Sequence, residues 1–365
     1  MIVEAFYAAT LSDLADEIAA NGTAKPDPIA ADSWVARSIL QKAIRRGMTD
    51  LALRAAAQLL LIDRRTLWRR LLVTALEDLG TGEFTTTVRV TAASRDSAWR
   101  ASTGGDWAVI AALVQGACEG TRCQAANDLW TIAMHDPRLS TFKADLCEAS
   151  IHDVVAIAVD QDYELGQRAV ATLLALGADV GTDAPAHIAP DPMGLFSAFA
   201  AVGDTPVIAA VYADTFRRTQ VALGGLALCL PDPGDKLQSI AKTSDEIPLV
   251  AWIDETPNFA LDQYTRHGKA AIRAYVAASV RWTRFTSGLG LSPTDSRNAA
   301  GELLFRIEGA AVTNRRSWDL GKRLHQCAAQ IGCFLPPVTV DEGKAILRAE
   351  LPLVDEMRRR IIHTL

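Results

Sequence analysis

The residues of this chain that could do chemistry are few and widely spaced. His325, Cys327 and Cys333 form an HxCxxxxxC cluster, but the second pair of ligands that zinc sites normally show does not accompany it. Cys118 and Cys123 are similarly isolated. We therefore expect the cysteines to be buried structural residues, with no metal bound and no disulfide framework.

Catalytic motifs are equally scarce. The histidines form no HExxH motif, no serine lies in GxSxG, and the segments TRHGKA and DEGKAI lack the upstream glycine and the Ser/Thr of a phosphate-binding loop. A nuclease-like set of carboxylates and a lysine holding Mg²⁺ would have to draw on Asp232, Asp235, Glu342 and Lys344, which lie far apart. The sequence predicts no catalytic residue and no cofactor. An enzyme whose site combines single residues from separate helices remains open.

The elements that would position any site are helices. Apolar residues make up 49% of the chain and aromatics only 6%, a mixture that favours packed helices over sheets. The segment 85–90 also suits a strand, but without a partner strand we expect it to be helical. Asp32 or Ser33 should cap the second helix, and Thr49 the third. We expect an all-α, multi-helical fold with helices over 3–20, 34–46, 50–61, 65–79, 85–94, 107–119, 122–135, 142–159, 163–176, 195–202, 206–223, 261–285, 295–313, 315–331 and 343–365, the last split at Pro352.

Gly/Pro-rich breaks divide the chain. Residues 1–32 should form an N-terminal helix and linker, 33–180 a helical domain, and 190–365 a second helical domain, with the boundary in the break at 177–192. The helix pairs suggest a solenoid-like stack or a helical bundle in two packed parts, and no fixed repeat period is evident.

Charge is unevenly distributed. The net charge is −6, but residues 33–80 hold nine Lys/Arg and four Asp/Glu, so the remainder carries −11. A basic region inside an acidic protein can hold a specific anionic partner while repelling others. The N-terminus lacks the apolar core of a signal peptide, and the apolar run Val221 to Leu230 is too short to cross a bilayer. We expect a cytoplasmic protein without membrane contact.

The stretch from Ile39 to Gly80, ILQKAIRRGMTDLALRAAAQLLLIDRRTLWRRLLVTALEDLG, resembles the C-terminal region of the replication-associated recombination AAA+ ATPases, the MgsA/RarA family. A weaker similarity continues through AVIAALVQGACEGTRCQAANDLW, so that the resemblance covers about residues 34–135. In that family this region belongs to the clamp-loader-like collar that makes the oligomer. Because the phosphate-binding loop is missing, the resemblance implies a collar-like oligomerising or scaffolding module without the motor.

Basic residues in this region are candidates for binding nucleic acid or a protein partner. They lie on the polar sides of two predicted helices, where the alternative is an ordinary solvated surface. Glu77 and Asp78 fall in the last helical turn, where the macrodipole disfavours negative charge. We expect these two acids to pair with Arg45 or Arg46 of the neighbouring helix. The candidate binding residues here are Arg45, Arg46, Arg65, Arg69 and Arg70.

A second basic stripe is predicted between residues 264 and 284, which include no acid. On one continuous helix its five cations fall within about 120° of the circumference, as expected for phosphate contacts. Tyr264 and Trp282 fall on the apolar side, so base stacking is not expected. The alternative is that acidic helices neutralise these cations. The stripe comprises Arg266, Lys269, Arg273, Arg281 and Arg284.

These observations lead to one functional hypothesis and one alternative. The hypothesis is a non-catalytic accessory protein of DNA replication, DNA repair or mobile elements, which binds DNA or a replication or repair partner and forms a homo-oligomer. The alternative is a protein-interaction component of a defence or phage-associated complex with no nucleic-acid role.

Overall fold

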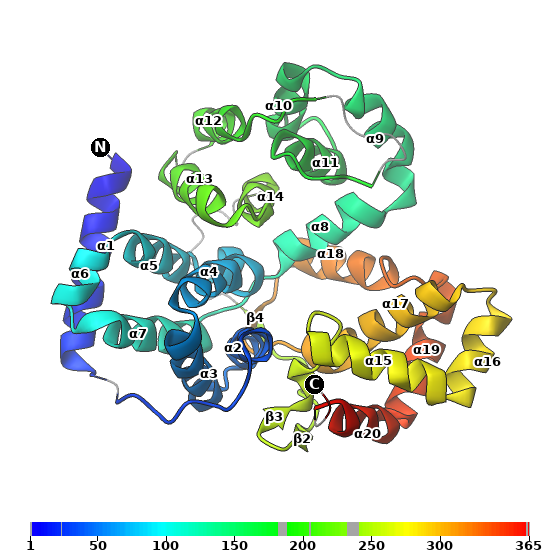
Figure 1. The fold of residues 1–365 in the computed structure, drawn as a ribbon. Helices are drawn as coiled ribbons and strands as arrows, with labels where there is room; N and C mark the ends of the chain where they lie inside the picture. Colours follow the sequence, from blue (N-terminus) through cyan, green and yellow to red (C-terminus); the bar gives the residue numbers. More distant parts are fainter. Residues whose placement is uncertain are drawn as a thin grey trace.

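The computed structural model describes residues 2–22, 24–181, 188–203, 206–231, 241–362 and 364. Within these ranges almost all regular structure is helical (Figure 1), which confirms the predicted all-α fold. The segment 85–90 is helical, as predicted. Buried apolar side chains in these ranges form three large clusters. None of the described helices has both the length and the apolar composition needed to cross a membrane.

The first cluster holds together the helices of the N-terminal third. As predicted, Asp32 begins α2 by accepting a hydrogen bond from the Val35 amide at 2.8 Å, and Gly47 ends the helix at φ +68°. Thr49 does not cap α3, because it is already the first helical residue. The elements are α1 (Ile2–Ala20), α2 (Ser33–Arg46), α3 (Thr49–Ile62), α4 (Arg64–Thr74), the π-helix η1 (Ala75–Leu79), the 3₁₀ turn η2 (Gly80–Gly82), α5 (Phe84–Arg95), α6 (Ser97–Ser102) and α7 (Gly105–Glu119).

The second cluster unites helices from both sides of the break at 177–192. Thr172 Oγ1 of α11 and Cys229 Sγ of α14 lie 3.0 Å apart, and both helices contribute to one core. The predicted domain boundary therefore does not separate two cores. The elements are α8 (Ala125–His135), η3 (Pro137–Leu139), α9 (Ser140–Cys147), α10 (Ile151–Val159), α11 (Leu165–Ala175), α12 (Pro192–Val202), α13 (Pro206–Thr219), α14 (Leu223–Cys229) and, from later in the chain, α18 (Asp319–Gln330).

The third cluster belongs to the C-terminal helices, which lie to the right in Figure 1. The predicted helix 261–285 is interrupted at Ser279, whose hydroxyl accepts a hydrogen bond from the Trp282 amide and starts a new helix. The last predicted helix is divided just before Pro352. The elements are α15 (Arg266–Ala278), α16 (Val280–Gly288), α17 (Pro293–Leu304), the π-helix η5 (Phe305–Gly309), η6 (Pro337–Thr339), α19 (Val340–Ala349) and α20 (Leu351–Ile362). The 3₁₀ turn η4 (Asn258–Ala260) precedes them, and its Phe259 and Ala260 belong to the first cluster.

Short extended segments join these groups. Strands β1 (Lys242–Thr243) and β4 (Arg315–Arg316) pair antiparallel, as do β2 (Trp252–Ile253) and β3 (Thr256–Pro257). Arg122 was predicted to start a helix, but its backbone is extended and pairs with the β4 segment: its amide donates to the Asn314 carbonyl, and its carbonyl accepts from Arg316. The β4 segment thus connects to the loop before α8.

Helix α2 lies between the first group and the C-terminal group and forms buried ion pairs with both. Arg45 Nε lies 2.5 Å from Asp78 Oδ1 of η1, which confirms the pairing predicted for Asp78. One turn earlier, Lys42 Nζ lies 2.6 Å from Asp262 Oδ2, just before α15. All four side chains are buried, so the Arg45–Asp78 pair fixes η1 against α2 and the Lys42–Asp262 pair fixes the start of α15 against α2.

Candidate nucleic-acid interface

The five cations of the predicted second stripe are all exposed on α15 and α16. We call them the α15–α16 basic surface; they are Arg266, Lys269, Arg273, Arg281 and Arg284. Among the described residues, none of these five side chains takes part in an ion pair or a hydrogen bond. The predicted alternative, neutralisation by neighbouring acidic helices, is thus not found within the described ranges. These side chains are available to an external anion.

The fold places them there because both helices are amphipathic. Ile272, Tyr275 and Trp282 are buried in the third core, which turns the basic side of each helix toward solvent. The interruption at Ser279 bends the stripe, so the cations follow two short helices instead of one straight rod. A hollow of about 340 Å³ lies at this bend, lined by Arg284 and by small side chains of both helices.

Positive charge dominates this part of the chain. Residues 264–362 hold sixteen Lys/Arg and nine Asp/Glu. Several of the acids serve internal contacts: Glu308 and Asp355 bind the buried Arg358 at 2.6 and 2.7 Å, and Glu350 accepts hydrogen bonds from Tyr275 and Ser279. Several cations of the same range, Arg306, Arg315 and Arg358, are also bound by carboxylates, so the excess of positive charge rests on the cations that have no such partner.

Arg45 and Arg46 were candidate binding residues, but both are buried and do not contribute to an exposed surface. Arg45 binds Asp78 and donates to the Gly309 carbonyl at 2.8 Å. Arg46 is 5% exposed, and its guanidinium lies 4.0 Å from the Phe259 ring centre. Sequence periodicity placed both on a polar helix side, and that side is covered by the C-terminal group, which lies more than two hundred residues away along the chain.

The remaining three candidates on α4 differ from one another. Arg65 is exposed. Arg69 is exposed but donates to the Thr219 carbonyl at 2.9 Å, and Arg70 is half-buried and donates to Gln41 Oε1 at 2.7 Å. The contact of Arg70 with Gln41 places this part of α4 beside α2, the helix that carries Arg37.

Trp282 and Tyr264, the two aromatic residues of the second stripe, differ in how far they are buried. Trp282 is fully buried, as predicted. Tyr264 was expected to face the core, yet it precedes α15 and is 58% exposed. The helical projection failed for Tyr264 because the helix begins only at Arg266, after Thr265 caps it.

Arg46 provides a test of how this buried region is stabilised. Burial, with a smaller effect from Arg45, lowers the pKa of Arg46 to about 10, and its Nε and Nη2 have no hydrogen-bond partner among the described residues. Its charge is therefore a cost to the folded state. We expect Arg46→Met to leave the free energy of unfolding unchanged or to raise it by roughly 1–4 kcal/mol.

Arg45→Met is the matched contrast, since it leaves Asp78 buried without its cation and should lower the free energy of unfolding. Urea unfolding followed by circular dichroism would measure both variants. Equal destabilisation by the two substitutions would show that a further contact compensates the buried charge of Arg46.

The residues considered for catalysis and metal binding do not converge. Within the described ranges, no three His, Cys, Asp or Glu side chains are placed as metal ligands would be. Cys333 is buried, and His325 Nδ1 lies 3.4 Å from Asp128 Oδ2. Lys344 lies 3.7 Å from the neighbouring Asp341. Asp232 and Asp235 lie outside the described residues.

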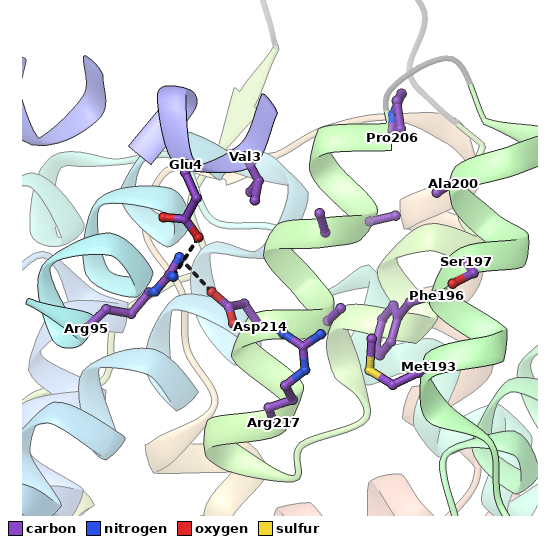
Figure 2. Close-up of a pocket in the computed structure, with 13 residues that line it drawn as sticks. Val3, Glu4, Arg95, Met193, Phe196, Ser197, Ala200, Pro206, Asp214 and Arg217 are labelled. Carbon is purple, nitrogen blue, oxygen red and sulfur yellow. Dashed lines mark hydrogen bonds and ion pairs between the residues drawn. The ribbon is translucent and has the colours of Figure 1, made fainter. Parts of the chain in front are cut away.

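A charged hollow that the sequence did not indicate lies between α1, α5, α12 and α13 (Figure 2), with a volume of about 280 Å³. Arg95 lines one side of it, with Nη2 2.7 Å from Glu4 Oε1 and Nη1 3.0 Å from Asp214 Oδ2. Asp214 also binds Arg217 at 3.1 Å. Because both carboxylates are bound by arginine, neither is free to act as a general base. No local motif could reveal this set, since its members come from distant segments.

Comparisons with protein-family models, with curated proteins and with solved structures found no match to this chain.

Proposed function

We propose that this protein binds DNA through the α15–α16 basic surface and acts as a non-catalytic accessory protein in DNA replication, DNA repair or mobile-element biology. The observation that carries the proposal is the exposure of five cations without an internal partner among the described residues. Other arginines of the chain, such as Arg45, Arg95 and Arg358, are bound by the protein's own carboxylates. Unpaired cations on one surface provide the electrostatic attraction that phosphate binding requires.

The wider setting of the proposal depends on the sequence resemblance. A collar-like module without a motor would act in the cytoplasm by assembling copies of itself and by contacting a replication or repair partner. The net charge of −6 supports selective binding, because a net-negative protein does not attract a polyanion indiscriminately.

Binding measured against salt concentration tests the DNA contact. Five phosphate contacts predict a slope of log affinity against log salt of about −4.5 for a duplex, or roughly a 500-fold loss between 50 and 200 mM salt. Fluorescence anisotropy of labelled single-stranded and duplex oligonucleotides would measure it. If neither probe binds at low ionic strength, the proposal is wrong.

A further inference from the structure

Two aromatic side chains are exposed near the beginning of α2 and of α15. Trp34 is 57% exposed and Tyr264 is 58% exposed, whereas Trp282, Tyr212 and Tyr275 are buried. Tyr264 is held in place by an edge-on contact with the Phe305 ring, 5.4 Å between ring centres. An exposed aromatic ring of fixed orientation is a surface on which a nucleic-acid base can stack.

Helix α2 connects these two rings. Lys42 Nζ binds Asp262, two residues before Tyr264, and at the other end of the helix Asp32 Oδ2 lies 3.6 Å from His267 Nδ1. The segment 262–267 therefore runs beside α2. The helical rise separates residues 34 and 42 by about 12 Å along α2. Trp34 lies near one end of this stretch and Tyr264, through Asp262 and Lys42, near the other, so the stretch is about as long as a few nucleotides.

Cations accompany the rings. The Arg37 guanidinium lies 3.9 Å from the Trp34 ring centre. On the other side, Arg266 begins the α15–α16 basic surface only two residues after Tyr264. The contact of Asp32 with His267 thus brings the beginning of α2, with Trp34 and Arg37, to the beginning of α15.

Nearby acids are engaged. Asp262 is bound by Lys42, and Glu302 lies 2.8 Å from Arg306. Asp63 accepts hydrogen bonds from the amide and the hydroxyl of Thr66 at the start of α4. Because these carboxylates are already bound, they make the electrostatic potential near the two rings less negative than free carboxylates would.

We infer that Trp34 and Tyr264 stack unpaired bases, so that the nucleic acid bound by this protein is single-stranded. The inference rests on the proposed function and adds the class of nucleic acid to it. In a duplex the base faces are covered by their neighbours, and the rings could contact only the backbone. The cations of Arg37 and Arg266 would hold the phosphates on each side of the stacked bases.

The test compares a labelled oligothymidylate with a duplex of equal length in fluorescence anisotropy. The wild-type protein should bind the single strand more tightly. Trp34→Ala and Tyr264→Ala should each weaken single-strand binding roughly tenfold or more, with little change for the duplex. Trp34→Phe and Tyr264→Phe keep a ring and should retain most of the affinity.

Trp130→Ala is the matched control, because Trp130 is 39% exposed on α8, outside this surface. Circular dichroism melting curves would verify that each variant is folded. Equal or tighter binding of the duplex by the wild-type protein, or unchanged single-strand affinity of both alanine variants, would overturn the stacking inference and leave the proposed DNA binding intact. Failure of the wild-type protein to bind either probe would overturn both.

Discussion

Replacing Arg266, Arg273 and Arg281 together by glutamate is expected to reduce DNA affinity by two to three orders of magnitude at about 0.1 M salt. Each lost phosphate contact removes about 0.9 from the slope of log affinity against log salt for a duplex, so three losses lower it by about 2.7. The three residues span both helices and are exposed. Anisotropy titrations at several salt concentrations would give the affinity and the slope.

A control with the same change in net charge is available elsewhere on the surface. Arg218 of α13 and Lys322 and Arg323 of α18 are exposed cations outside the α15–α16 basic surface. Their triple replacement by glutamate should leave the slope unchanged and lower affinity much less. If both triple variants lose affinity equally, binding depends on overall charge, and the α15–α16 basic surface has no special role.

The helices were predictable because their signals are local. Asp32 and Gly47 bound α2 by capping chemistry that neighbouring residues supply, and the apolar stripe of α4 repeats at the helical period. The interruption at Ser279 was missed because Ala277 and Ala278 are good helix formers, and nothing in the sequence marks the change of direction. Serine at this position could have been identified as a cap only after the bend was known.

The grouping of helices could not be predicted from the same signals. The break at 177–192 is rich in glycine and proline, which marks a connection but does not tell which cores lie on its two sides. Contacts such as Thr172 with Cys229 join segments that are distant in sequence. Likewise α18 belongs to the second core although it follows the helices of the third.

The candidate site was only partly predictable for a similar reason. Both basic stripes show the same helical spacing, yet Arg45 is buried against Asp78 while Arg273 is exposed. What distinguishes them is whether a distant segment covers the helix. The position of Glu77 and Asp78 in a final helical turn was the local signal of such a covering, because unfavourable placement in the helix dipole requires compensation.

The cations of this protein are of two kinds, which have different roles. Cations at the junction of helix groups are bound by carboxylates and stabilise the fold; Lys42, Arg45 and Arg358 are of this kind. Cations on α15 and α16 have no such partners within the described ranges. Replacing a cation that is bound by a carboxylate should therefore change the stability of the fold. Replacing a cation on α15 or α16 should change the affinity for DNA.

Asp78→Lys tests most directly whether a buried ion pair stabilises the fold. Asp78 is fully buried, accepts from Arg45 at 2.5 Å and also accepts from Gln41 at 3.0 Å. Replacing it by lysine places two like charges together and leaves Arg45 unpaired, which is expected to cost about 3–5 kcal/mol or more. If the chain unfolds in one transition, this lowers the melting temperature by roughly 4–7 °C. Differential scanning calorimetry would measure the shift.

Two further variants separate the ion pair from other effects of the substitution. Asp145→Lys makes the same charge change at an exposed position of α9 and should melt close to the wild-type temperature. The double variant Arg45→Met with Asp78→Leu removes both charges and should recover much of the lost stability, because an apolar pair of similar volume can replace a buried ion pair. If Asp78→Lys melts with Asp145→Lys at the wild-type temperature, the contact between α2 and η1 does not depend on this pair.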